Sequence, residues 1–225
     1  MKNKKGDFLW GAALLVWILI LVVPASRTVF IASTDAHPYI GGFIKFFILA
    51  TMGDLLGVRI LRGEWFKPQG LVAKAVVWGL LGMAITLVFT VFTGGAAVAQ
   101  SSGKLPFAGS KLAQAFFGST IMNLTFGPML YIYHKFGDLY IDAKIEKKFG
   151  KVTVEELVAK VDWYTMVSFS WLKTCLFIWI PGHTIVFLLP PQYRVLTSAF
   201  LSILLGILVA VSKKGAQSPA VAANA

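Results

Sequence analysis

The sequence predicts an all-α fold, a polytopic membrane bundle of about six transmembrane helices. Of its 225 residues, 57% are hydrophobic and only 14% are charged, whereas soluble domains carry about 25% charged residues. Repeated charge-free segments of spanning length are typical of a chain in a bilayer and not of a soluble core. Such segments lie between Asp7 and Arg27, Lys74 and Lys104, Lys111 and Lys135, and Arg194 and Lys213.

The apolar segments form a single membrane domain over residues 1–214. We expect spans at about residues 8–23, 39–61, 71–92, 112–134, 163–189 and 194–211. Pro24 is expected to end the first span, since proline stops or kinks a helix, and a polar outer loop should follow it. Residues 93–110, rich in Gly, Ala and Ser, are expected to form a flexible loop. Pro128 and Pro181 are expected to break the fourth and fifth spans.

A cytoplasmic helical connection is predicted over residues 135–162, where lysines and acidic residues balance each other. Gly150 is expected to cap the end of its first helix. Thr153 and Glu156 have the spacing of a capping box, which predicts that a second helix starts there. The tail, residues 215–225, consists of small residues and is expected to be disordered.

The formal net charge is +11. The Lys and Arg residues are concentrated on one side of the predicted spans. Positive residues favour the cytoplasmic side of membrane proteins. Both termini are therefore predicted to be cytoplasmic, in a bacterial cytoplasmic membrane or, in a eukaryote, an organelle membrane. The chain has no basic patch interleaved with aromatic residues, so we expect no nucleic-acid partner. One side holds Lys2, Lys4, Lys5, Arg59, Arg62, Lys67, Lys74, the lysines of residues 135–160, Lys213 and Lys214; the other holds Arg27, Lys104, Lys111 and Arg194.

Asp54 is the most informative polar residue, because a short carboxylate inside a span needs a partner, a proton or water. Arg59 lies five positions away, outside the three-and-four spacing at which helical side chains meet. Lys173 is expected at a comparable depth in the fifth span. We therefore hypothesise an interhelical pair between Asp54 and Lys173, which either lines or gates a pore or only packs and orients the helices.

Two further features accompany this aspartate. Gly53 and Gly57 form a small-xxx-small pattern, which lets another helix approach closely. His134 and His183 join Asp54, Lys173 and Arg59 as candidate intramembrane polar or pore residues.

No metal site is predicted, because the three histidines are too scattered to share a metal ion. The common hydrolase, protease and nucleotide-binding motifs are also missing from the sequence. We therefore expect no catalytic residues, no cofactor and no enzymatic activity. If the chain were an unrecognised membrane enzyme, Asp54, His134 and His183 would be its acid–base candidates.

Three short patterns occur in order along the chain: the glycine–aspartate pair Gly53-Asp54, the segment from Gly127-Pro128 through Tyr133 to Asp138, and Pro190 followed by Tyr193-Arg194. Together they resemble the Mpv-seventeen and peroxisomal membrane protein family of small integral membrane proteins. The resemblance covers roughly residues 46–211, and Tyr133-His134 stands where the family more often has Trp-Tyr.

The resemblance implies a channel-like membrane protein that passes ions or small metabolites. We accordingly expect a helix-bundle channel or transporter whose partners are the lipid bilayer, a small solute or ion, and in some arrangements further copies of the chain. A structural or assembly protein without a conducting path is the main alternative, because polar groups also hold helices together. An unrecognised membrane enzyme is the third.

Overall fold

The part of the chain that the structure, a computed structural model, describes is mostly helical. That part covers residues 4–216, with side chains described up to residue 207. Within it no strand occurs, so the predicted all-α class is confirmed. The elements are α1 (Lys4–Val22), α2 (Pro24–Ala36), α3 (Pro38–Arg62), α4 (Leu71–Ser101), α5 (Lys111–Glu146), α6 (Val154–Ala159), α7 (Trp163–Thr165), the π-helix η1 (Met166–Trp179), α8 (Ile180–Leu188) and α9 (Pro191–Ala216).

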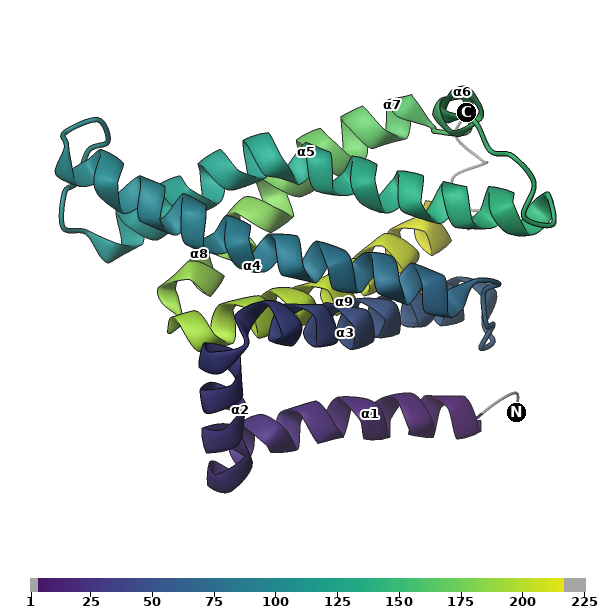
Figure 1. The fold of residues 1–225 in the computed structure, drawn as a ribbon, viewed down its shortest axis with the longest axis horizontal. Coiled ribbons are helices and arrows are strands. Elements are labelled where there is room, and N and C mark those ends of the chain that lie inside the picture. Colours follow the sequence, from purple (N-terminus) through teal and green to yellow (C-terminus); the bar gives the residue numbers. More distant parts are fainter. Residues whose placement is uncertain (1–3, 217–225) are drawn as a thin grey trace.

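The long helices run back and forth along one axis, whereas α2 lies across it (Figure 1). Helix α3 packs against α4 and α9, α4 packs against α5, and α5 packs against η1 and α8. The start of α1, the loop at residues 63–70, α6 and the end of α9 share one end of the bundle, here called the terminal end. Helix α2 and the loop at residues 102–110 mark the opposite end, called the α2 end.

Three helices have the length and apolar composition needed to cross a membrane: Lys4–Val22, Leu71–Ser101 and the continuous helix Trp163–Leu188. Many large apolar side chains on these helices are exposed, among them Phe8, Leu80 and Phe177. Exposed apolar surface of this extent is expected where lipid replaces water. The chain therefore has the character of an integral membrane protein.

The expected polar loop after the first span is instead helix α2. Pro24 ends α1 and also occupies the first turn of α2, a position where the missing N–H costs no hydrogen bond. The expected flexible loop at residues 93–110 is shorter too, because α4 continues to Ser101. Alanine, the best helix former, is frequent in this extra segment.

Neither proline inside the later helices breaks them. Helix α5 continues through Pro128 to Glu146. Around Pro181 the chain passes from the π-helix η1 into α8 without leaving a helical path. Pro181 lies in the first turn of α8. At the junction of the π-helix with the α-helix, this position does not require a backbone N–H donor.

The connection after α5 contains the predicted capping box. The Glu156 N–H donates to Thr153 Oγ1, and the Thr153 N–H donates to Glu156 Oε2, both at 3.3 Å. A salt bridge from Lys147, at 2.6 Å, helps to keep the pKa of Glu156 below its ordinary value. Helix α5 ends before Gly150, which does not cap it. Of the predicted tail, residues 215–216 belong to α9, and residues 217–225 lie outside the described part.

Glycines bring α3 close to its neighbours on two sides. Gly57 and Gly53 face α9, where a Cβ added at Gly53 would lie 3.1 Å from the Ile203 Cα. This contact confirms the small-xxx-small prediction. Gly42 and Gly82 make the corresponding contact between α3 and α4, since a Cβ at Gly82 would lie 2.7 Å from the Phe46 Cβ. No larger residue fits there unless the helices move apart.

We expect Gly82→Ala to lower the free energy of unfolding by about 1–3 kcal/mol, the usual cost of overpacking. Gly94→Ala on the same helix is the matched control, because an added Cβ there meets no atom within 4 Å. Thermal unfolding of the purified protein in detergent measures the difference. Equal stability of the two variants would contradict the close packing of α3 on α4.

Candidate functional site

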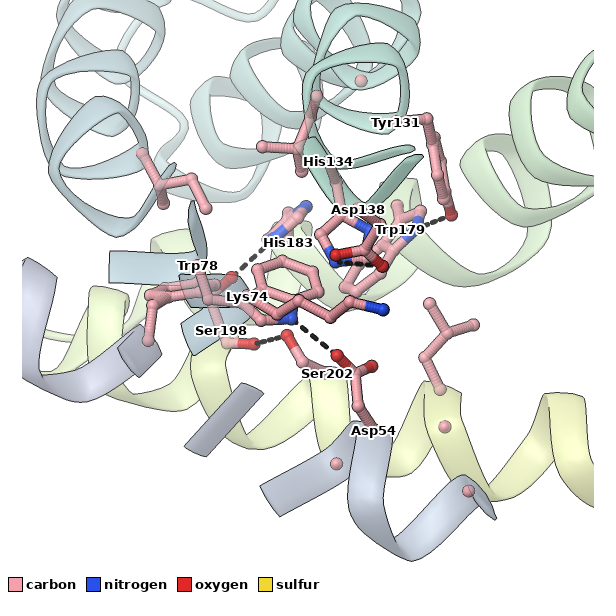
Figure 2. A pocket seen from close by; sticks show the side chains of 18 of the residues that line it. Asp54, Lys74, Trp78, Tyr131, His134, Asp138, Trp179, His183, Ser198 and Ser202 are labelled. Carbon is pink, nitrogen blue, oxygen red and sulfur yellow. Dashed lines mark hydrogen bonds and ion pairs between the residues drawn. The ribbon is translucent and has the colours of Figure 1, made fainter. Parts of the chain in front are cut away.

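A cavity of about 460 Å³ lies between α3, α4, α5, η1, α8 and α9 (Figure 2). It reaches the terminal end of the bundle, where Leu61, Pro68 and Lys74 line it. Its lining ends near Phe46 and Phe89. Toward the α2 end a buried apolar cluster follows, with members Phe30, Leu49, Phe89, Phe187 and Leu196. The cavity is therefore one-sided.

Asp54 faces this cavity from α3, and its partner is Trp78 on α4. The Trp78 Nε1–H donates to Asp54 Oδ2 at 2.7 Å. The expected pair with Lys173 is wrong, since Lys173 is exposed on η1 and forms no ion pair within the described residues. Asp54 thus receives its hydrogen bond from a neutral donor, the indole of Trp78.

His134 and Asp138 on α5 complete this polar group. The rings of Trp78 and His134 lie 4.0 Å apart between centroids, and Figure 2 shows His134 beside Asp138. His134 Nε2 lies 3.7 Å from Asp138 Oδ2, which is too long for a hydrogen bond. His134 Nε2 and Asp138 Oδ1 are buried atoms without a hydrogen-bond partner among the described residues.

Lys74 is also in the cavity wall, but its charge is already engaged. Its Nζ forms an ion pair with Asp142 Oδ1 on α5 at 2.8 Å. The pair joins α4 to α5 at the terminal end.

A second polar group lies deeper in the cavity, around His183 on α8. His183 Nδ1 lies 3.2 Å from Asn123 Oδ1, and its Nε2 lies 3.0 Å from Ser198 Oγ. The amide nitrogen of Asn123 donates to the Ser119 carbonyl at 2.8 Å, so its oxygen is the acceptor. This pattern assigns the proton to Nδ1 and leaves Nε2 to accept from the Ser198 hydroxyl.

Ser198, His183 and Asn123 are hydrogen-bonded in the same order as a catalytic nucleophile, its general base and the residue that orients the base. Ser198, however, is only 3% exposed and lies inside α9, where backbone N–H groups are paired within the helix. They cannot form an oxyanion hole beside it. The group therefore joins α5, α8 and α9 through satisfied hydrogen bonds.

Aromatic residues form much of the remaining wall. The Trp179 Nε1–H donates to Tyr131 Oη at 2.7 Å, and the Trp179 ring stacks on His183 with centroids 5.2 Å apart. Both aromatic residues line the cavity. Neither these two residues nor Trp78, Asn123 and Ser198 were predicted from the sequence as site residues. One sequence pattern could have identified Trp78: it lies four positions after Lys74, so the two side chains share a face of the helix.

The structure brings together only part of the candidate set. Asp54, His134 and His183 line the cavity, as do the motif residues Gly53, Gly127 and Asp138. Arg59 instead lies near the terminal end, where its Nε donates to Asp7 Oδ1 at 3.0 Å.

The other motif residues lie outside the cavity wall. Tyr133 is half exposed, and Pro128 is partly buried within α5. Pro190 lies in the turn between α8 and α9. Tyr193 packs against Phe30, and the Arg194 Nε–H donates to the Leu189 carbonyl at 2.9 Å. These last three residues shape the turn at the α2 end.

We expect Asn123→Ala to destabilise the protein by about 1–3 kcal/mol, because it leaves a buried His183 nitrogen without its partner. Thr125→Ala on the same helix should change stability far less, since the Thr125 side chain is exposed and bonds only to the Ile121 carbonyl. Unfolding in a denaturing detergent series compares the two. If Asn123→Ala unfolded at the same midpoint as the wild type, this hydrogen bond would not contribute to the stability of the protein.

Comparison with known proteins returned no relative: no protein-family profile, curated protein or solved structure matches this chain.

Proposed function

We propose that this protein is a channel- or transporter-like membrane protein that binds a small solute or ion in its one-sided cavity. The observation that carries the proposal is that two buried polar atoms beside the cavity, His134 Nε2 and Asp138 Oδ1, have no hydrogen-bond partner among the described residues. Polar groups inside a membrane bundle are costly and mark solute pathways when they face a cavity. The resemblance to the Mpv-seventeen family agrees with this proposal.

The contrast between the two polar groups argues against a purely structural role. Polar residues that only hold helices together are expected to bond to one another, as His183 does with Asn123 and Ser198. Asp138 and His134 do not reach hydrogen-bonding distance of each other. An assembly protein without a conducting path has no need of buried polar atoms that lack hydrogen bonds. This alternative is tested by a flux measurement.

We further propose six membrane spans: α1, α3, α4, α5, the α7 to α8 helix and α9. Their alternating directions along one axis support this assignment (Figure 1). Helix α2 then lies along the membrane surface. The basic residues at the terminal end, among them Arg62, Lys67 and Lys147, outnumber Arg27, Lys104, Lys111 and Arg194 near the α2 end. By the positive-inside rule the terminal end, with both termini, faces the cytoplasm.

Single-cysteine labelling in a Cys175→Ser background tests this topology. In intact bacterial cells that express the protein, a membrane-impermeant maleimide should label Ser102→Cys at the α2 end. It should label Lys151→Cys at the terminal end only after permeabilisation, which also serves as the control for reactivity. Labelling of Lys151→Cys in intact cells would reverse the proposed orientation.

Flux through liposomes containing the purified protein tests transport. We expect solute-selective flux that Asp54→Asn reduces by about tenfold, equivalent to about 1.4 kcal/mol of barrier, because the variant removes a charge from the cavity wall. Glu155→Gln is the control, since Glu155 is exposed on α6 and does not line the cavity. Lack of flux for inorganic ions, amines, carboxylates and sugars alike would favour the structural alternative.

A further inference from the structure

The charge of the cavity wall indicates which solutes it accepts. Asp54 and Asp138 project into the cavity from α3 and α5. Lys74 is the one lysine or arginine among the described lining residues, and Asp142 already neutralises it. Asp54 receives its hydrogen bond from the neutral indole of Trp78. Within the described residues, the two carboxylates of the wall therefore face no free lysine or arginine, and a cationic group of the solute would balance them.

The aromatic residues around this charge suit the same kind of group. Phe46, Trp78, Phe126, Tyr131 and Trp179 line the cavity. Aromatic faces attract ammonium groups, most strongly where water is excluded. They also provide an apolar surface for the body of a solute. A volume of about 460 Å³ falls in the lower half of the roughly 300–1,000 Å³ typical of small-molecule sites.

The deep end of the cavity excludes a second charge on the solute. His183, Asn123 and Ser198 bond to one another, and Phe89 packs edge-on against His183 with ring centroids 5.4 Å apart. A charged group placed there would lose its water without gaining a charged partner. The same argument disfavours an amino acid, because Lys74 is not free to bind its carboxylate.

We infer that the solute is a small organic monocation, an amine with an apolar or aromatic body. Its ammonium group lies between Asp54 and Asp138, and its body extends toward Phe89. The inference rests on the proposed function, since it identifies the substrate class of the same cavity.

Isothermal titration of the full-length protein in lipid nanodiscs, with empty nanodiscs subtracted, tests this class. The probes are 2-phenylethylamine, 3-phenylpropanoate and 2-phenylethanol, which have similar bodies and differ in charge. We expect the amine to bind at least tenfold more tightly than the other two at pH 7.5. Asp54→Asn and Asp138→Asn should each weaken amine binding by about tenfold, whereas Glu155→Gln should leave it unchanged.

Equal or tighter binding of the carboxylate or the alcohol to the wild-type protein would overturn the inference, and this comparison needs no variant to fold. Wild-type affinity in both Asp54→Asn and Asp138→Asn would overturn it as well. Liposome flux separates the two proposals. Selective flux of an anion or a neutral solute would leave the transport proposal intact and refute the amine. Amine binding without flux of any solute would support the substrate class and refute transport.

Discussion

The close contact of α3 with both α4 and α9 determines where the cavity can form. Gly42 and Gly82 bring α3 to α4, and Gly53 and Gly206 bring it to α9. With α3 fixed on two sides, Asp54, one residue beyond Gly53, is directed into the space bounded by α4 and α5. A larger residue at either contact would separate the helices and move the carboxylate away from Trp78. The close packing of these glycines is thus required for the Asp54 carboxylate to face the cavity.

Predictions that depend on local sequence agree well with the structure. The glycine spacing around Asp54 and the capping box at Thr153 rely on neighbours within one helical turn, and both are confirmed. Helix α2 was missed because its Ser and Thr residues resemble a loop. Their side chains instead bond to carbonyls of the preceding turn, as Thr28 does to Pro24 and Ser33 to Val29.

The Asp54–Lys173 hypothesis failed because sequence gives the depth of a residue better than the direction it faces. Lys173 lies within η1, a π-helix, whose bonding to the fifth preceding residue changes the rotation per residue. Positions that share a face in an α-helix diverge there. The pairing of Trp78 with Asp54 depends on how α3 and α4 cross, which no single-helix pattern contains. This is why the cavity could be expected from Asp54, but its aromatic wall could not.

Under the function proposed above, the one-sided shape of the cavity favours a transporter over an open channel. Between its deep end and the α2 end lies the buried cluster of Phe30, Phe187 and their neighbours. Lys45, 3% exposed, adds a second barrier, because its Nζ bonds to Thr34 at 3.0 Å and lies over the Phe30 ring. A cation held at Asp54 would have to pass this ammonium group and the apolar cluster, both unfavourable for a charge. If the protein transports a cation as we propose, α2, which carries Phe30 and Thr34, has to move relative to α3, and this rearrangement would limit the flux.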